Sequence, residues 1–508
     1  MNRPPHSLDD DSRARFVADG CLTVRTTLPA DFHSDLYARI DELFEKEGNP
    51  GNNLLPRLPE IRRVFDDPAV AGALESLLGP GYVMNPHRHC HLNPPGSPGQ
   101  SWHKDCYVFD HNLRHPRFRW VLGFYYPQDV TADMGPTGVL PGQQWYRTIS
   151  DPDPGKATER EEPLLGEAGT VAIVHFDSWH RAIANQSSRK RYMLKFQFAR
   201  TAEPDLSGAA DGHRSWEESG AVCSDVWRWL GGYGNGPPAG SEEPIGGWVD
   251  QLGSSSSPAD RARAADHIAL SGAAADAVPA LARALADEAE PVRLNAAYAL
   301  AAAEEGPGLL AGRLRREAAA SEERATAKTA DNAHGTNPTA PAAAHALAVT
   351  PGGDEAAAGL LDDGHWLVRA SAAGALGNMG PGAALHEAAL CAATADEHWW
   401  VRRNALEALG RLPGAGDDAL EAATRCLRDE DYRVRRNAAI ALRHAAAPAA
   451  ETVPALVEML RDENRYNRFY AADGLRRLAP VSPEAGACLM DHLFTSRWCP
   501  LTTPDSLY

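Results

Sequence analysis

The chain has 508 residues, of which 43% are hydrophobic and 23% charged, and its formal net charge is −18 at pH 7. This length exceeds what one ordinary core holds, so two or three domains are expected. The negative charge disfavours nonspecific binding to nucleic acid or to an anionic membrane. No apolar run approaches the roughly 20 residues that span a bilayer, and the start Met1–His6 lacks the pattern of a secretory signal, so a cytoplasmic protein is expected.

The first two hundred residues combine strand-like segments with proline and glycine turns. Strands are expected in three segments rich in β-branched and aromatic residues, at 120–126, 169–176 and 191–198. Turns are expected at 94–99 and 134–138, where proline and glycine cluster. Residues 1–201 are therefore predicted to form a β-rich domain with helices near its start.

A loop-rich linker is predicted at residues 202–257, where glycine, proline and serine gather. Two short helices are expected within it, around 222–230 and 245–252. Their tryptophans are expected to dock the flanking domains onto one another rather than to take part in chemistry.

Residues 258–482 change to an alanine- and leucine-rich composition with helical periodicity. An arginine recurs every 33 residues, at Arg369, Arg402, Arg435 and Arg468. Such a period predicts stacked helical pairs, each unable to bury its apolar face alone. Further copies are placed at Arg263 and Arg293, with an insertion at 326–343, and residues 483–508 are predicted to be a C-terminal tail.

These segments resemble HEAT-like repeats of the phycobilisome-lyase type. The resemblance predicts a solenoid but leaves its partner open, because such arrays bind many kinds of molecule. Two roles remain for the repeated arginines. The pairs at 402–403 and 435–436 would form a basic stripe for an anionic partner, or the arginines would pair with Asp396, Asp429 and Asp462 of neighbouring repeats, which is the favoured interpretation.

The first domain contains a candidate metal site. His103 and Asp105 are two residues apart, so on an extended segment their side chains point to the same side. His180 follows much later in the chain and would complete a set of two histidines and one carboxylate. This set holds non-haem Fe(II) on one face and leaves coordination positions open.

Arg191 is the candidate partner for an anionic co-substrate. A buried arginine pairs well with a carboxylate because its planar guanidinium donates two parallel hydrogen bonds. On a strand it would share one face with Met193, Lys195 and Gln197. Arg189 would share that face too, but it lies nearer the expected turn.

In three places residues 10–200 resemble the phytanoyl-CoA dioxygenase family of Fe(II)- and 2-oxoglutarate-dependent oxygenases. The matching residues are Ser101–Asp105, Gly135–Gly142, and His180 through Asn185 to Arg191. The resemblance implies a double-stranded β-helix (jelly roll), Fe(II) at His103, Asp105 and His180, and 2-oxoglutarate and O₂ as co-substrates. The overall fold class expected is thus multidomain α+β, an oxygenase core followed by an all-α solenoid.

The chain departs from the family pattern at two positions. Gln143-Gln144 stands where the family often has Ser-His, and Ala182 stands where it often has Ser. Neither is a metal ligand. The carboxylate at Asp105 favours hydroxylation over halogenation, because chloride needs the position that the carboxylate takes.

Further side chains are candidates for contacts within the site. Trp145 is expected beside the co-substrate, and Tyr107, His89 and His91 are expected to contact the substrate. His87, His89 and His91 alternate along one strand face, but no carboxylate or cysteine accompanies them, so a lining role is favoured over a second metal site.

The sequence therefore predicts an oxygenase that oxidises a C–H bond of a small metabolite, in natural-product biosynthesis, releasing succinate and CO₂. One alternative is an oxygenase acting on a peptide, protein or carrier-bound substrate presented by the repeats. Another is a noncatalytic interaction protein with a vestigial oxygenase domain, which the four retained site residues disfavour. No membrane partner is expected, nucleic acid is disfavoured, and the oligomeric state stays open.

Overall fold

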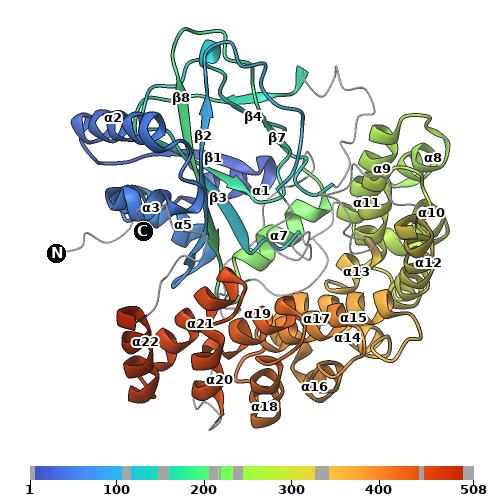
Figure 1. Cartoon of the computed structure of the whole chain (residues 1–508). Helices are drawn as coiled ribbons and strands as arrows, with labels where there is room; N and C mark the ends of the chain where they lie inside the picture. Colours follow the sequence, from blue (N-terminus) through green and yellow to red (C-terminus); the bar gives the residue numbers. More distant parts are fainter. Residues whose placement is uncertain are drawn as a thin grey trace. The chain divides into compact units, whose positions relative to one another are not determined.

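The structure is a computed structural model that describes residues 6–105, 116–146, 159–204, 216, 219–232, 244–326, 342–444 and 451–495. The chain divides into two compact units near Ala299, and each is taken by itself (Figure 1). The mixed α+β class is confirmed, because the first unit contains the described strands and the second is helical.

Two antiparallel sheets form the β-rich part of the first unit. One has five strands in the order β1-β6-β3-β8-β2, and the other has three in the order β5-β4-β7 (Figure 1). The strands are β1 (Cys21–Arg25), β2 (Val83–Asn93), β3 (Trp120–Tyr125), β4 (Thr137–Val139), β5 (Glu162–Leu164), β6 (Thr170–His175), β7 (His180–Ala182) and β8 (Arg191–Ala199). The three strands expected from sequence are confirmed as β3, β6 and β8, which are neighbours in the larger sheet.

Strand β8 separates an apolar layer from a polar interior. Tyr192 packs against Phe44 with ring centroids 5.1 Å apart, and Phe196 and Phe198 pack against Phe65 at 4.5 and 5.2 Å. Because side chains alternate along a strand, the odd-numbered residues point the other way. The helices that supply Phe44 and Phe65 thereby fix which side of β8 faces the interior.

Helices cover the larger sheet and continue past it in the first unit. Figure 1 shows α2, α3 and α5 on one side of the strands. The helices of this unit are α1 (Asp10–Asp19), α2 (Ala30–Glu47), α3 (Leu54–Arg57), α4 (Arg62–Phe65), α5 (Pro68–Leu78), α7 (Ala221–Leu230), α8 (Gly246–Ser254), α9 (Pro258–Leu270), α10 (Val278–Ala284) and α11 (Glu290–Leu300), which ends at the boundary.

Both helices predicted in the linker are present, as α7 and α8. Trp229 of α7 lies 5.9 Å from Phe118 between ring centroids, next to the guanidinium of Arg119. Asp225 of the same helix receives two hydrogen bonds from the buried Arg117. Trp229 thus packs on the β-rich core, and docking of the two domains by the linker tryptophans stays a prediction.

The first repeat-like helices belong to the same compact unit as the strands. Asp266 of α9 accepts hydrogen bonds from the Ala221 backbone N–H at 3.0 Å and from Asn295 Nδ2 at 2.6 Å. Tyr146 in turn donates to Asn295 Oδ1 at 3.4 Å. Composition changes near residue 258, whereas the compact units divide near residue 300, so the domain boundaries drawn from sequence remain a proposal.

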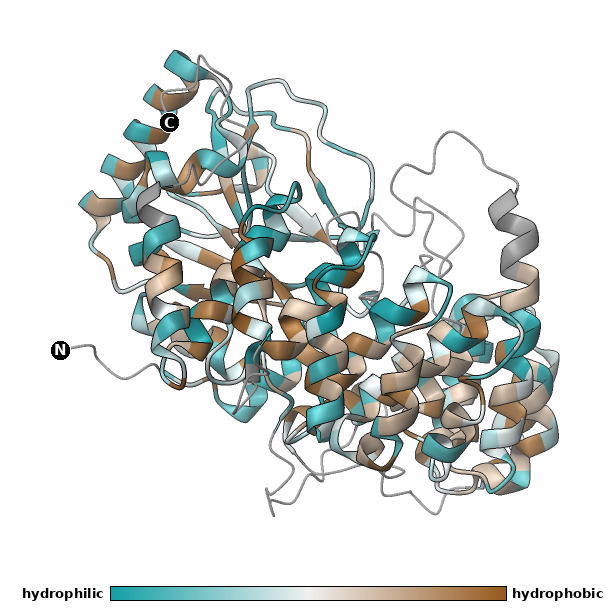
Figure 2. Cartoon of the chain, turned by 60° about the horizontal axis from the view of Figure 1, so that its bottom comes forward, coloured by the Kyte–Doolittle hydropathy of each residue, from teal (hydrophilic) through white to brown (hydrophobic). Residues whose placement is uncertain are grey.

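The second unit is an array of helical pairs. Its helices carry hydrophobic and hydrophilic residues together, as the mixed colours of Figure 2 show. They are α12 (Gly306–Thr326), α13 (Ala342–Leu347), α14 (Gly353–Ala358), α15 (Trp366–Met379), α16 (Glu387–Ala393), α17 (Trp399–Leu409), α18 (Asp417–Cys426), α19 (Tyr432–Ala441), α20 (Thr452–Met459), α21 (Arg465–Leu478) and α22 (Pro483–Thr495). None of the described helices has the length and apolar character needed to cross a membrane.

The favoured interpretation of the repeated arginines is confirmed. Arg369 and Arg402 each donate two hydrogen bonds to one aspartate of the next repeat, respectively Asp396 and Asp429, and Arg435 Nε donates one to Asp462. Each also donates to backbone carbonyls just before its own helix. The arginines are therefore a structural ladder that joins successive repeats.

One expectation for the repeats was wrong. The arginine in the ladder position of the first copy is Arg261, which pairs with Asp287, whereas Arg263 is exposed and pairs with Asp260. Side chains two residues apart point to nearly opposite sides of a helix, so Arg263 lies away from the ladder. Within the predicted C-terminal tail at 483–508, residues 483–495 form α22; most of the expected insertion at 326–343 lies outside the described residues.

Candidate metal centre

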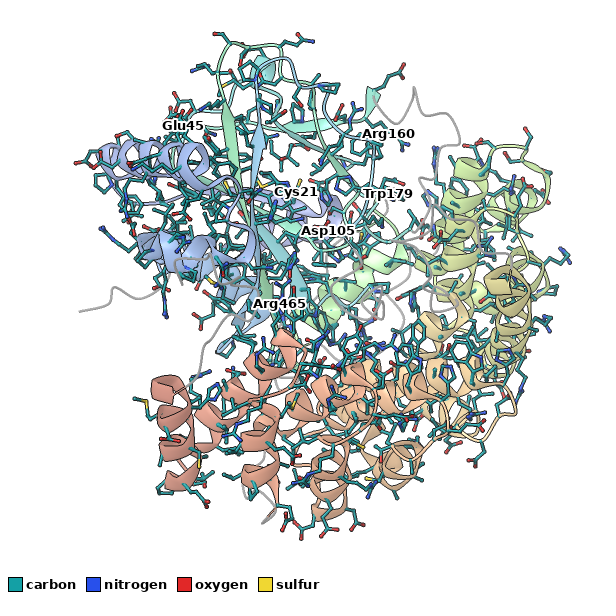
Figure 3. The ribbon with its side chains drawn as sticks, viewed as in Figure 1. Cys21, Glu45, Asp105, Arg160, Trp179 and Arg465 are labelled. Carbon is teal, nitrogen blue, oxygen red and sulfur yellow. The ribbon has the colours of Figure 1, made fainter. Side chains whose placement is uncertain are left out.

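Three candidate ligands from separate parts of the chain meet inside the first unit. His103 and His180 form an antiparallel bridge, with N···O distances of 3.1 and 3.0 Å between their backbones. The ligand atoms of His103, Asp105 and His180 all lie within 4.8 Å of one another. Figure 3 labels Asp105 in the interior of this unit. Within the described ranges no second cluster of this kind includes His87, His89 or His91.

Backbone carbonyls fix how the two histidines point. His103 Nδ1 lies 2.9 Å from the Ser101 carbonyl oxygen, and His180 Nδ1 lies 3.0 Å from that of Ser178. A carbonyl only accepts, so each Nδ1 carries the hydrogen, and in a neutral ring Nε2 is left as an acceptor. His180 Nε2 lies 3.9 Å from Asp105 Oδ2. Acceptors that face one another in this way fit a bound cation.

The ionisation states agree with a cation site. Burial lowers the pKa of His180 to about 4, although Asp105 opposes the shift, so the ring is neutral near pH 7. Burial alone would raise the pKa of Asp105, but Lys195, His180 and His103 together outweigh it and lower the pKa. His180 thus offers a neutral imidazole and Asp105 a carboxylate, the forms of these side chains that bind metal.

Lys195 of β8 holds the carboxylate of the centre. Its Nζ lies 2.6 Å from Asp105 Oδ2, and both side chains are at most 5% exposed. The close contact of ammonium and carboxylate keeps Asp105 in one orientation. Lys195 was placed on the interior face of its strand by sequence, but its pairing with Asp105 was not foreseen.

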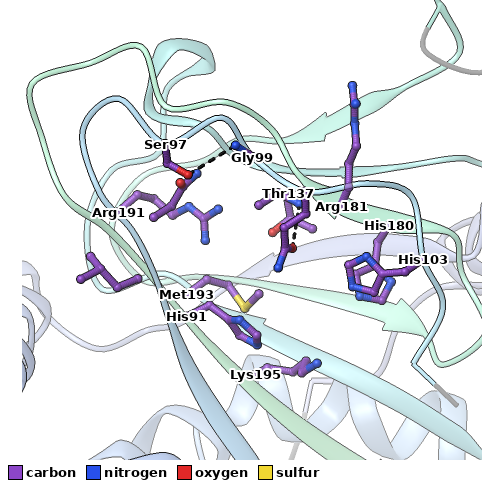
Figure 4. A pocket seen from close by; sticks show the side chains of 14 residues that line it. His91, Ser97, Gly99, His103, Thr137, His180, Arg181, Arg191, Met193 and Lys195 are labelled. Atoms are coloured by element: carbon purple, nitrogen blue, oxygen red, sulfur yellow. Dashed lines mark hydrogen bonds between the residues drawn. The ribbon is translucent and has the colours of Figure 1, made fainter. Parts of the chain in front are cut away.

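A pocket joins this centre to Arg191 (Figure 4). Arg191 lies at one end in this view, His103 and His180 lie at the other, and Met193, His91 and Lys195 lie along the lower side. The full lining is His91, Leu92, Asn93, Ser97, Gly99, Gln100, His103, Thr137, His180, Arg181, Ala182, Arg191, Met193 and Lys195. The face shared by Arg191, Met193 and Lys195 is therefore the pocket face of β8, as the strand periodicity predicted.

Arg191 presents one edge of its guanidinium to the pocket. Its Nε and Nη2 both donate to the Gly135 carbonyl, at 3.0 and 2.7 Å. The Nη1 atom and the second hydrogen of Nη2 are thus left for a ligand, as far as the described residues go. Burial lowers the pKa of Arg191, and an arginine still keeps its charge near neutral pH. The competitor Arg189 is exposed and lies near Thr131.

Gly135 has to be glycine for this arrangement. Its φ is +66°, which L side chains rarely adopt, and a Cβ there would lie 2.6 Å from the Ile183 carbonyl oxygen. The turn at 134–138 expected from sequence thereby aims a carbonyl at the guanidinium of Arg191.

Of the remaining candidate contact residues, one lines the pocket and the others do not or lie outside the described residues. His91 lines the pocket, and its buried Nε2 has no hydrogen-bond partner among the described residues. Burial lowers the pKa of His91 well below the usual value. His89 lies outside the lining, and its Nε2 is 3.0 Å from Asn49 Nδ2. Trp145 also lies outside it, with its ring 5.2 Å from that of His175, so a co-substrate contact is not supported. Tyr107 lies outside the described residues.

Sequence reasoning did not single out two hydroxyl groups of the lining. Ser97 and Thr137 belong to turn-rich segments that were noted for other reasons, and Thr137 Oγ1 accepts a hydrogen bond from the buried Tyr126. Nothing in a single sequence marks a hydroxyl as pocket-facing, because the pocket face of so short a strand as β4 is set by its partners β5 and β7.

Comparison with known proteins agrees with this geometry. Residues 28–193 match the family model for phytanoyl-CoA dioxygenase, and residues 353–443 and 420–498 match the model for HEAT repeats. No curated protein matches the chain.

Several solved structures are similar to part of the chain. One is the non-haem α-ketoglutarate-dependent carbocyclase SnoK from nogalamycin biosynthesis (16% identity, TM-score 0.32, covering 39% of this chain and 88% of that one). Another is the epimerase SnoN of the same biosynthesis (19%, 0.33, 41% and 90%). A third is HygX from Streptomyces hygroscopicus with iron bound (11%, 0.32, 39% and 88%). By the family models, residues 28–193 are similar to phytanoyl-CoA dioxygenase and residues 353–498 are similar to HEAT repeats.

Proposed function

We propose that the protein is a non-haem Fe(II)- and 2-oxoglutarate-dependent oxygenase that oxidises a C–H bond of a small metabolite. One observation carries the proposal: the acceptor atoms of His103, Asp105 and His180 face one another in the same pocket as the guanidinium of Arg191. Two histidines and one carboxylate suit Fe(II), and a buried arginine suits the far carboxylate of the co-substrate.

Iron and 2-oxoglutarate, when bound, supply the activation of O₂, with succinate and CO₂ as co-products. The chain supplies the positions. Ser101 and Ser178 carbonyls hold the hydrogen of each imidazole on Nδ1, so that Nε2 stays free to bind. Lys195 holds Asp105, and Gly135 holds Arg191 with one guanidinium edge turned to the pocket. Met193 lines the pocket as an apolar surface between them.

The proposal extends to the architecture and the biological setting. The two sheets would form the double-stranded β-helix of the family, within an oxygenase domain at residues 1–201, a linker at 202–257 and a solenoid at 258–482. A cytoplasmic location and a role in natural-product biosynthesis are part of the proposal.

In a second candidate function, the oxygenase acts on a larger substrate. The presence of HEAT repeats in the same chain favours a protein or carrier-linked substrate held by the second unit. The two candidates differ in what turnover needs: a free metabolite requires no partner, whereas a carrier-linked one is oxidised only when attached. A noncatalytic protein with a vestigial domain is the remaining candidate, and it predicts no turnover of 2-oxoglutarate.

The direct test is 2-oxoglutarate turnover by the full chain with Fe(II) in aerated buffer. We expect succinate and CO₂ in equal amounts, and loss of both in His103→Ala and Asp105→Ala because each removes a ligand. His386→Ala is the matched control, since this histidine pairs with Asp354 in the repeats. Succinate no higher than in metal-free protein, with the variants and the wild type alike, would refute the proposal.

A further inference from the structure

The ammonium group of Lys195 is buried beside the candidate metal centre, and Asp105 is its anionic neighbour among the described residues. Lys195 projects from β8 on the same face as Arg191 and Met193, and all three line the pocket. Its Nζ donates to Asp105 Oδ2 at 2.6 Å, the one hydrogen bond that the described residues give it. An ammonium has three donors, so Lys195 can take further acceptors from a ligand.

A bound metal ion changes the electrostatic surroundings of Lys195, because the metal and the ammonium then share the Asp105 carboxylate. The ammonium lies within a few ångströms of wherever Asp105 holds a metal, since Nζ and Oδ2 are 2.6 Å apart. Two cations so close in a buried site repel one another strongly. A further anion near Nζ relieves this repulsion.

Among the described residues that line the pocket, none supplies such an anion. Arg181 is already neutralised by Glu161 through two hydrogen bonds. A divalent metal is balanced by Asp105 and one carboxylate of 2-oxoglutarate, and Arg191 is balanced by the other carboxylate. Lys195 then remains as one uncompensated buried positive charge, which is costly unless a ligand pairs with it.

We propose that Lys195 forms a carboxylate-binding subsite beside the metal, where Asp105 is its partner in the metal-free protein and a ligand carboxylate joins Asp105 in the loaded one. The charge balance favours a carboxylate of the primary substrate, which makes that substrate an acid. The proposal rests on the oxygenase function above and adds its substrate class. The near carboxylate of 2-oxoglutarate is the other source of the same chemistry.

The test uses full-length protein loaded with Co(II) and N-oxalylglycine, an unreactive analogue of 2-oxoglutarate. Acetate and acetamide are titrated as probes of equal size that differ in charge, and binding is read from the visible Co(II) spectrum and the melting temperature. Lys195→Met removes the charge, Lys195→Arg keeps it, and Lys190→Met is the control, because Lys190 pairs with Asp41 and Glu45 outside the pocket.

We expect wild type, Lys195→Arg and Lys190→Met to bind acetate about tenfold or more tightly than acetamide, and Lys195→Met to lose this preference. A second outcome also supports the subsite. The wild type shows no acetate preference, but the Kd for N-oxalylglycine rises about tenfold in Lys195→Met alone. This result assigns the subsite to the co-substrate. Equal acetate and N-oxalylglycine binding in Lys195→Met and wild type overturns it.

Metal binding is measured first, so that two failures stay separate. Wild type that takes up no Co(II) contradicts the proposed function itself. Wild type that takes up Co(II) and N-oxalylglycine, with no dependence of either carboxylate on Lys195, contradicts the subsite alone. If Lys195→Met does not fold, Lys195→Gln takes its place as the variant without the charge.

Discussion

At the scale of single residues, local backbone contacts prepare the centre for metal. His103 and His180 each direct Nδ1 to the carbonyl two residues earlier in the chain. This local pattern sets the tautomer without any other side chain, so the histidines are oriented before a metal binds. Such orientation strengthens metal binding. Groups that hydrogen-bond to a metal ligand commonly raise the metal affinity by about tenfold or more.

Arg191 gives the first prediction at this scale. Arg191→Met keeps the length of the side chain and removes the charged hydrogen bonds to the co-substrate. Such bonds contribute about 1.5–3 kcal/mol, so the Kd for 2-oxoglutarate should rise by about 10- to 100-fold. Calorimetric titration of the metal-loaded protein measures it. Arg189→Met, an exposed neighbour, should leave the Kd unchanged, and equal effects of the two variants would show that Arg191 does not bind the co-substrate.

At the scale of elements, each repeat is joined to the next by a buried arginine fork. Arg402 donates two hydrogen bonds to Asp429 at 2.8 Å and others to the carbonyls of Asp396 and Glu397. One guanidinium thus joins the start of its own helix to the following repeat. Lysine cannot do this, because its single ammonium has no planar fork.

The ladder gives a prediction with an internal control. Arg402→Lys should lower the stability of the second unit by about 1–3 kcal/mol, because the buried aspartate loses its two-point partner. Arg428→Lys changes an exposed arginine that pairs with Glu458 across the next pair of repeats, and it should cost well under about 1 kcal/mol. Urea unfolding followed by circular dichroism compares them, and similar losses for both would refute the ladder as a source of stability.

Much of these elements could be predicted from the sequence, for physical reasons. Strand β8 was predictable because apolar and polar residues alternate along it, and the ladder was predictable because its arginine recurs every 33 residues. The contact of Lys195 with Asp105 was not, since it joins residues 90 positions apart through the fold. The co-substrate contact of Trp145 stays a prediction, because sequence alone does not tell an aromatic residue that packs in a core from one that lines a pocket.

At the scale of the whole molecule, composition and compactness divide the chain at different places. The alanine-rich pattern begins near residue 258, yet α9 and α11 belong to the compact unit that holds the strands. Asp266 is the polar contact at this junction, bonded to the start of α7 and to Asn295 of α11. The first repeat-like helices therefore serve as part of the catalytic unit's core.

Asp266 predicts a pH dependence of this junction. Burial raises its pKa from the ordinary 3.8 to about 7. Between these values the folded chain keeps a proton that the unfolded chain has released, so stability falls as pH rises through this window. The melting temperature of the wild type should drop more than that of Asp266→Asn between about pH 5 and about pH 8. Parallel pH profiles for the two proteins would show that Asp266 does not titrate in this way.

The central claim is that one pocket holds both iron and 2-oxoglutarate, and anaerobic absorption spectroscopy tests it most directly. Adding 2-oxoglutarate to the Fe(II)-loaded full chain should produce a weak visible metal-to-ligand charge-transfer band that saturates, because chelation brings the 2-oxo group onto the metal. The band should be lost in Asp105→Ala and should need more 2-oxoglutarate in Arg191→Met. No band at saturating Fe(II) and 2-oxoglutarate would contradict the account.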